Sequence, residues 1–155
     1  MEAIGVIRSP FEVLANMPVQ PRGAANIKGE VIVDPAYQEG LADLDGFSHI
    51  YILYHFHQAR RTELKVIPFM DDTLRGVFST RSPLRPNHIG LSLVELLEVR
   101  ENRLVVCGID VLDNTPLLDI KPYIAVFDRV AESRSGWLSA DEHEVAKKRS
   151  DSRFS

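Results

Sequence analysis

The stretch FSHIYILYHFHQ, residues Phe47–Gln58, decides how this chain folds, because it carries the strongest strand pattern in the sequence. Aromatic and β-branched residues dominate it, and its apolarity is nearly continuous, which is typical of a strand at the centre of a sheet. Alternation puts His49, Tyr51, Leu53, His55 and His57 on one face, and Ile50, Ile52, Tyr54, Phe56 and Gln58 on the other. We therefore expect a central strand, with the remaining strands arranged around it.

Further strands are predicted on both sides of this stretch. They are Ala3–Pro10, Gly29–Pro35, Leu64–Pro68, Gly76–Thr80, Leu91–Val99, Arg103–Leu112 and Leu117–Tyr123. The clearest hairpin joins Leu91–Val99 to Arg103–Leu112 through a turn around Arg100–Asn102. A turn is expected at Asp113–Pro116, and a short helical turn fits Tyr37–Gly46. Many short strands separated by Pro and Gly turns predict an all-β barrel or sandwich with small helical decorations.

The strongest helix start lies near the C-terminus. Ser139 and Glu142 have the spacing of a capping box, and Ala140–Arg149 has helix-forming composition with basic residues in its last turn. The residues that follow, Ser150–Ser155, are expected to fray. We therefore predict a single β-barrel domain over residues 1–138 and a C-terminal helix and tail over residues 139–155.

Composition limits the class of protein. The chain has 155 residues, of which 45% are hydrophobic and 26% charged, which suits one domain with an ordinary core. It has no apolar run long enough to span a membrane and no signal-peptide pattern, so we expect a cytoplasmic protein. Its single cysteine, Cys107, excludes disulfide and zinc frameworks and is interpreted as a small buried hydrophobe. The formal charge of −4 does not indicate nucleic-acid binding, yet a local basic patch could still contact phosphates.

Chemistry is expected in the loops at the strand ends. Thr80–Ser92 contains two arginines and two prolines together with Asn87 and Gly90, which predicts a rigid, positively charged loop. The other polar loop clusters are Pro18–Gly23, His57–Gln58 and Asp110–Thr115. Together these loops offer cations for a carboxylate and acids for ribose hydroxyls or an amine, a mixture that suits a zwitterionic nucleoside. Taken singly, each acid is better explained as a turn-capping residue, and only the combination makes a ligand site equally well supported.

Other chemistries are less well supported by the sequence. No glycine-rich dinucleotide motif, phosphate loop or serine nucleophile elbow is present. His55 and His57 have a geometry that could share a metal, but no Asp, Glu or Cys stands nearby at a ligand spacing. Partly buried, hydrogen-bonded histidines are therefore the favoured interpretation, and a metal hydrolase that uses His49, His55 and His57 is a weaker alternative.

Several of these motifs, taken in order, resemble the TrmO family, also called TsaA-like or VirR-like. The matching runs are Ile4–Pro10, Gly46–Ile50, Gly76–Ser82, Arg85–Asn87, Ile89–Val94, Asp110–Pro116 and Asp119–Tyr123, and the similarity extends to about Trp137. The resemblance implies a β-barrel methyltransferase that binds S-adenosylmethionine, commonly as a homodimer with the cofactor near the subunit interface. It also implies tRNA as substrate, methylated at N6 of the threonylcarbamoyl-adenosine at position 37.

The resemblance also implies site residues. The family's cofactor contacts would fall on Val19, Gln20, Pro21, His57, Gln58, Arg85, Leu93, Asp110, Val111, Leu112 and Asp113. Arg85 would hold the methionine carboxylate, because a guanidinium makes two-pronged bonds to carboxylates. If the reaction uses a general base, Asp119 and Tyr123 are the catalytic candidates. No metal is implied.

Three departures from the family pattern stand out. His88 occupies the place of a usual proline, which is expected to loosen the loop, and Asn114 replaces a glycine, which is mild because Asn tolerates a positive φ. Compared with longer bacterial members, we expect no additional C-terminal domain. Candidate phosphate contacts are Arg60, Arg61, Arg75, Arg81 and Lys147–Arg149, although each is better explained as a solvated charge. The alternative functions are a regulatory module that binds the cofactor or a related nucleoside without turnover, and a methyltransferase that acts on another acceptor.

Overall fold

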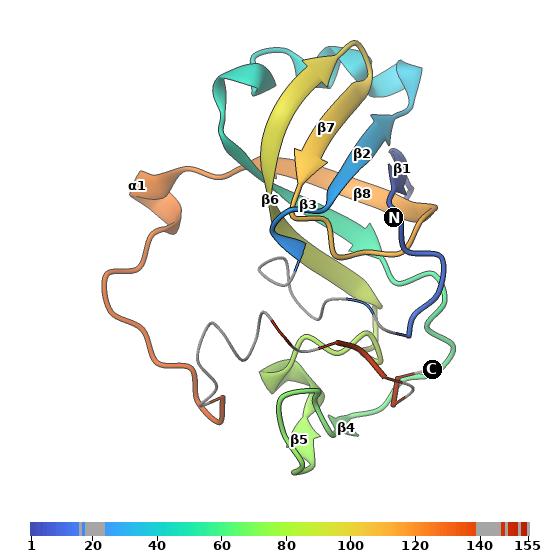
Figure 1. Ribbon diagram of the computed structural model, residues 1–155, viewed down its shortest axis with the longest axis vertical. Coiled ribbons are helices and arrows are strands. Elements are labelled where there is room, and N and C mark those ends of the chain that lie inside the picture. The colour runs from blue at the N-terminus through green and yellow to red at the C-terminus, as the bar shows by residue number, and fades with distance from the viewer. Residues whose placement is uncertain (16, 18–23, 139–146, 148, 152, 155) are drawn as a thin grey trace.

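A computed structural model, which describes residues 1–15, 17, 24–138, 147, 149–151 and 153–154, shows a closed antiparallel barrel. The six strands are β1 (Gly5–Arg8), β2 (Lys28–Val33), β3 (His49–His55), β6 (Ile89–Arg100), β7 (Arg103–Cys107) and β8 (Thr115–Pro122). They follow one another around the barrel in the order β1-β2-β7-β6-β3-β8, and β8 closes onto β1 (Figure 1). The expected all-β class is confirmed, and closure decides for a barrel over a sandwich.

The predicted central strand is β3, which lies between β6 and β8. Burial alternates along it as expected: Ile50, Ile52 and Tyr54 are buried, whereas His49, Tyr51, Leu53 and His55 are only partly buried. The strand ends at His55, so Phe56, His57 and Gln58 belong to a loop and not to the strand as the pattern predicted. Its inward side chains pack with Ile7, Val31, Leu104 and Leu117 in the main core.

The predicted hairpin is present as β6 and β7, with shifted ends. β6 is long because its first half pairs with β3 and its second half with β7, and a register shift between Leu96 and Glu98 accommodates the change of partner. β7 stops at Cys107, earlier than expected, because Gly108 has a φ of 91° and leaves the ladder. β8 begins at Thr115, so the predicted turn there ends sooner, at Asn114 with a φ of 64°.

A second, smaller unit lies below the barrel in Figure 1. It contains β4 (Lys65–Val66), β5 (Arg75–Gly76) and the 3-10 helix η4 (Val77–Ser79). The prediction of a strand over Gly76–Thr80 is therefore wrong: the chain turns after Gly76, and the amide of Thr80 donates to the carbonyl of Val77. Val66, Val77 and Leu84 form a separate small core, against which Phe154 packs.

The remaining elements are short helices. The 3-10 helices η2 (Pro35–Leu41) and η3 (Leu44–Gly46) confirm the predicted helical turn. Helix α1 (Ala125–Asp128), which the sequence did not indicate, stands away from the barrel on an extended segment (Figure 1). Most of the predicted C-terminal helix lies outside the described residues. Among the described residues, no helix has the length and apolarity needed to cross a membrane.

Candidate functional site

A cleft of about 70 Å³, partly open to solvent, lies between one end of the barrel and the smaller unit. Its lining residues come from distant parts of the chain: Leu14, Met17, Tyr54, Phe56, His57, Gln58, Ala59, Pro83, Asp110, Val111, Leu112, Thr115 and Phe154. Most of these side chains are apolar. Asp110 is the only carboxylate among the described lining residues, so it gives the cleft its electrostatic character.

A line of hydrogen bonds runs from the barrel interior to this carboxylate. The hydroxyls of Tyr54 on β3 and Ser92 on β6 lie 3.0 Å apart, and Ser92 Oγ donates to Asp110 Oδ1 over 2.6 Å. Because the single hydroxyl proton of Ser92 is committed to Asp110, Tyr54 must donate to Ser92. Proton donation therefore runs in one direction, from Tyr54 through Ser92 to Asp110.

The backbone of β6 leaves room for the Tyr54 ring. Gly90 lies opposite Tyr54 in the strand register. A Cβ added to Gly90 would lie 2.2 Å from Tyr54 Cε2, a distance that carbon atoms do not tolerate without movement. The absence of a side chain at Gly90 thus allows the tyrosine to lie across β6 and reach Ser92.

Burial dominates the protonation of this line. It raises the pKa of Asp110 to about 6, although the Ser92 hydrogen bond and the Arg81 charge oppose the shift. Burial, together with the Asp110 charge, also raises the pKa of Tyr54 well above its ordinary value, so the phenol keeps its proton and stays a donor. At neutral pH the Asp110 carboxyl is mostly ionised in a largely apolar cleft.

Asp113, three positions along, has a different role. Burial tends to raise its pKa, but hydrogen bonds from the Ser9 amide and the Arg8 guanidinium outweigh burial and lower it. Arg8 Nε and the Ser9 amide lie 2.8 Å and 3.0 Å from Asp113 Oδ1, and Ser9 Oγ donates to the carbonyl of Val111 over 2.6 Å. These contacts fasten the segment that carries Asp110 to the end of β1.

Residues near the C-terminus make hydrogen bonds that fix the outer side of the cleft. We call the described residues Ser150, Asp151, Arg153 and Phe154 the C-terminal strap. The Ser150 amide donates to the Met17 carbonyl over 2.7 Å, the Met17 amide donates to Ser150 Oγ over 2.8 Å, and Ser150 Oγ donates to the Leu14 carbonyl. These bonds place Leu14 and Met17 at the cleft.

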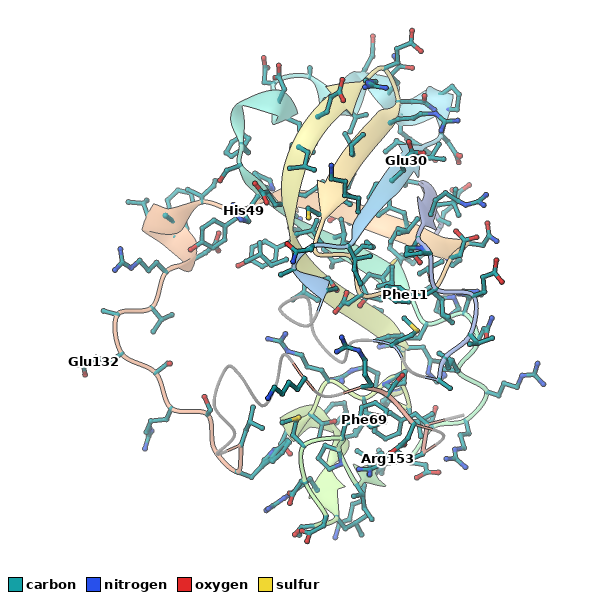
Figure 2. All side chains as sticks on the ribbon, viewed as in Figure 1. Phe11, Glu30, His49, Phe69, Glu132 and Arg153 are labelled. Atoms are coloured by element: carbon teal, nitrogen blue, oxygen red, sulfur yellow. The ribbon has the colours of Figure 1, made fainter. Side chains whose placement is uncertain are left out.

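The strap is also anchored to the smaller unit. Arg153 Nη1 donates to the Pro68 carbonyl over 2.7 Å, and its guanidinium lies 5.4 Å from the ring centre of Phe69, beside which Figure 2 shows it. The rings of Phe69 and Phe154 are 4.7 Å apart. The expectation of a frayed tail is therefore wrong for these described residues, because side-chain contacts fix them on both sides of the cleft.

The predicted loop ends at His88, because β6 begins at Ile89, and hydrogen bonds within the loop turn the Arg85 side chain back onto it and not into the cleft. Arg85 Nη1 donates to the carbonyls of Thr80 and Ser82, and its guanidinium lies 6.0 Å from the ring centre of Phe78. His88 does not loosen the loop as expected. Its φ of 49° is one that proline cannot adopt, and its Nδ1 lies 2.8 Å from the Pro83 carbonyl oxygen.

The structure brings together some of the predicted cofactor contacts and separates others. Those that line the cleft are His57, Gln58, Asp110, Val111 and Leu112. Arg85, Leu93 and Asp113 are not among its lining residues, and Val19, Gln20 and Pro21 lie outside the described residues. Their assignment as cofactor contacts therefore stays a prediction.

The two catalytic candidates lie on the outer face of the barrel. Asp119 pairs with Leu53, an outward position of β3, and its carboxylate lies 3.1 Å from Lys121 Nζ. The ring centre of Tyr123 lies 6.3 Å from that of His49 and 6.0 Å from that of Tyr51. Neither residue lines the cleft, so within one chain they do not meet the other site residues.

The sequence gives no indication of a function for several residues at the cleft. The alternation puts Tyr54 on one face with Ile50 and Ile52 but assigns it no chemistry, and Ser92, which bonds to Asp110, has no predicted role. A signal for Ser92 does exist, because it is the one hydroxyl among the inward positions Gly90, Ser92, Val94 and Leu96 of β6. Leu14, Met17 and Phe154 carry no such signal. In the part of the chain that the structure describes, no cluster of three His, Cys, Asp or Glu residues could hold a metal, which removes support from the metal-hydrolase alternative.

The sequence matches the family described as the tRNA-methyltransferase O N-terminal domain over residues 6–129. The chain belongs to the TrmO family. A solved structure of TrmO from Pseudomonas aeruginosa superposes with a TM-score of 0.73 and is 40% identical, covering 90% of this chain and 61% of that one. The TrmO barrel is therefore the fold of this chain.

Two relatives place the chain within the TrmO family. A Pyrococcus abyssi protein, named as a probable S-adenosyl-L-methionine-binding protein, is 48% identical over 151 residues, which are 97% of this chain and 82% of that protein. The tRNA (adenine(37)-N6)-methyltransferase of Mus musculus is 39% identical over 136 residues, which cover 82% of this chain but only 31% of the mouse protein. This chain thus has nearly the extent of the archaeal relative and spans a minor part of the mammalian one.

Proposed function

We propose that this protein is a methyltransferase that uses S-adenosylmethionine and modifies N6 of threonylcarbamoyl-adenosine at position 37 of tRNA. The observation that carries the proposal is the meeting of two segments that the family resemblance predicts as cofactor contacts, His57–Gln58 and Asp110–Leu112, at one cleft in a chain that matches TrmO over residues 6–129. The mouse relative is named as an adenine N6-methyltransferase acting at position 37 of tRNA, which supports the same reaction.

The residues of the cleft suit this cofactor. Apolar side chains such as Val111, Leu112 and Phe56 offer surface for an adenine ring and a methionine chain, while Gln58 and Asp110 offer polar groups. When bound, S-adenosylmethionine supplies a methyl group already activated by a sulfonium. The protein then needs chiefly to hold the cofactor and the acceptor nitrogen in line and to exclude water.

Removal of the proton from the acceptor needs no residue of extreme basicity. The described cleft contains two groups that can take up a proton, Asp110 and His57. Asp119 and Tyr123 would serve as a base only if a second copy of the chain brought its outer barrel face to this cleft. The proposed role of these two residues therefore depends on the proposed homodimer.

Exposed apolar side chains support the homodimer. Leu91 and Leu97 on the outer side of β6 are 48% and 43% exposed, and Val126 and Phe127 on α1 are 85% and 77% exposed. Apolar surface of this kind is commonly covered in an assembly. Sedimentation at micromolar concentration should report twice the chain mass of 17.5 kDa, and a monomer that still binds the cofactor would exclude this arrangement.

The direct test of function is methyl transfer from isotopically labelled S-adenosylmethionine to tRNA, read by mass spectrometry of the digested nucleosides. We expect label on threonylcarbamoyl-adenosine and none when the same tRNA lacks the threonylcarbamoyl group. Absence of label on both tRNAs, with cofactor binding confirmed by calorimetry in the same sample, would contradict the enzyme assignment.

One observation favours a second candidate function. The archaeal relative of nearly the same extent carries a name that states cofactor binding and no reaction. A regulatory module would bind S-adenosylmethionine at the same cleft and change its affinity for a partner. It would release no S-adenosylhomocysteine in the presence of modified tRNA, so the labelling experiment separates the two functions.

A further inference from the structure

Asp110 is the only carboxylate among the described residues that line the cleft, and hydrogen bonds orient its side chain. Asp110 accepts a 2.6 Å hydrogen bond from Ser92 Oγ on β6, and Ser92 Oγ in turn accepts a hydrogen bond from the Tyr54 hydroxyl on the neighbouring strand β3. No described lysine or arginine lines the cleft. Water compensates the negative charge of an ionised acid poorly when apolar side chains surround it. Such an acid therefore favours a ligand whose positive charge lies next to apolar groups of the ligand.

We propose that Asp110, positioned by Ser92 and Tyr54, makes the cleft select the charged sulfonium cofactor over the neutral thioether that remains after methyl transfer. The inference rests on the proposed function and adds a physical reason for product release. Methyl transfer breaks one sulfur–carbon bond, whose electron pair stays on sulfur. The methyl group joins the acceptor nitrogen, and the proton of that nitrogen is released to solvent. The ligand therefore loses one positive charge, and with it the attraction to Asp110.

Ser92 and Tyr54 are positioning residues in this scheme. Ser92 contacts Asp110 directly at Oδ1, and Tyr54 acts on Asp110 only through the Ser92 hydroxyl, so together they hold the carboxyl group in place and stabilise its ionised form. Gly90 contributes indirectly, because its missing side chain makes room for the Tyr54 ring. Loss of either hydroxyl should weaken the selection without removing the charge.

The charge of Asp110 also makes the selection dependent on pH. The buried carboxyl has a pKa of about 6, so it becomes neutral as the pH falls through that value. The groups that act on it are Tyr54 from β3, which stays protonated, and Arg81 from the loop that precedes β6, which favours ionisation. His57 lines the same cleft and would repel a cationic ligand when protonated, so a His57→Asn variant is needed to separate its contribution.

The experiment measures dissociation constants for S-adenosylmethionine and S-adenosylhomocysteine by calorimetry at pH 7.5. Wild type is compared with Asp110→Asn, Ser92→Ala and Tyr54→Phe. Glu98→Gln is the matched control, because it removes one negative charge from a side chain paired with Arg100 at the far end of β6. The two ligands share their amino and carboxyl groups, so the ratio of their constants isolates the sulfur.

We expect Asp110→Asn to reduce the preference for S-adenosylmethionine by about tenfold or more, mainly through weaker binding of that ligand. Tyr54→Phe and Ser92→Ala should each reduce it by roughly threefold. Glu98→Gln should leave it unchanged. In wild type and His57→Asn, the preference should fall between pH 7.5 and pH 5, and addition of Asp110→Asn to the His57→Asn variant should abolish this dependence.

Equal weakening of both ligands would overturn the inference, because Asp110 would then contact a group common to both. An unchanged preference would overturn it as well. Should Asp110→Asn fail to fold, Tyr54→Phe and Ser92→Ala keep the test decisive, since a preference unchanged in both contradicts the positioning line. Failure of wild type to bind either ligand would overturn the proposed function itself, a result that is distinguishable from binding without selection.

Discussion

The two sides of the cleft are built in different ways. On the barrel side, Tyr54 belongs to a strand paired on both edges, and Ser92 and Asp110 are tied to it by hydrogen bonds. On the outer side, Leu14, Met17 and Phe154 are held by hydrogen bonds and ring contacts of the C-terminal strap. A change on the barrel side should therefore lower the stability of the whole fold, whereas a change on the outer side should alter the cleft and leave the barrel folded.

The largest effect should come from Gly90→Ala, which places a Cβ against the Tyr54 ring on the barrel side. We expect a loss of about 3 kcal/mol in the free energy of unfolding, because an overpacked core must shift both the ring and β6. Cofactor affinity should fall with it, since the same ring leads to Asp110. Urea denaturation and calorimetry measure the two quantities.

A matched control is Gly40→Ala in η2, where an added Cβ has no neighbour within 4 Å. It should change the free energy of unfolding by less than about 0.5 kcal/mol. Equal stability of the two variants would show that the barrel side yields easily and would remove the contrast between the two sides.

The sequence predicted much of the barrel side of the cleft and little of the outer side. The alternation of Phe47–Gln58 predicted which residues of β3 share a face, and the β6–β7 hairpin was visible because its partners are neighbours in the chain. The family resemblance pointed to Asp110–Leu112 and His57–Gln58 as cofactor contacts. These features depend on patterns within short stretches of the chain, which can be read from a single sequence.

The rest depends on contacts between distant residues. Tyr54 and Ser92 are separated by 38 positions, and Ser150 bonds to Met17 across 133 positions, so no local pattern pairs them. The strand predicted over Gly76–Thr80 failed for a similar reason: the small core around Val77 selects a 3-10 turn over the extended form that Val and Phe favour. The direction of Arg85, toward the carbonyls of its own loop, is likewise a tertiary outcome.

Removal of the strap tests the outer side. Deletion of residues 150–155 should weaken binding of S-adenosylmethionine by roughly thirtyfold, about 2 kcal/mol, because Leu14, Met17 and Phe154 lose their placement at the cleft. The barrel should keep its cooperative unfolding, with a smaller loss of stability than in Gly90→Ala. Cofactor affinity unchanged by the deletion would show that the strap has no part in the site.

Two single variants divide the strap's contribution. Ser150→Ala removes the hydroxyl bonds to the Leu14 carbonyl and the Met17 amide but keeps the backbone bond to the Met17 carbonyl. Phe154→Ala removes the ring that lines the cleft and packs on Phe69. A larger loss of affinity in Phe154→Ala would mean that the ring itself forms the wall. A larger loss in Ser150→Ala would assign the effect to placement of the Leu14–Met17 segment.

The smallest expected effect is the loss of folding stability that the charge of Asp110 causes on the barrel side of the cleft. Burial raises the pKa of Asp110 from 3.8 to about 6, so between these values the folded protein binds more protons than the unfolded chain, and stability falls as the pH rises. Asp110→Asn, which keeps an oxygen to accept the Ser92 bond, should therefore stabilise the ligand-free protein by about 1 kcal/mol at pH 7.5.

That gain should shrink as the pH falls through 6 and vanish only below the unfolded pKa of 3.8, where the wild-type carboxyl is protonated in both states. Thermal unfolding of wild type and Asp110→Asn across this range measures it. A stability difference independent of pH would show that Asp110 is not ionised in the folded protein. A gain confined to neutral pH, combined with the expected loss of preference for the sulfonium ligand, would mean that one buried charge lowers the stability of the barrel and gives the cleft its selectivity.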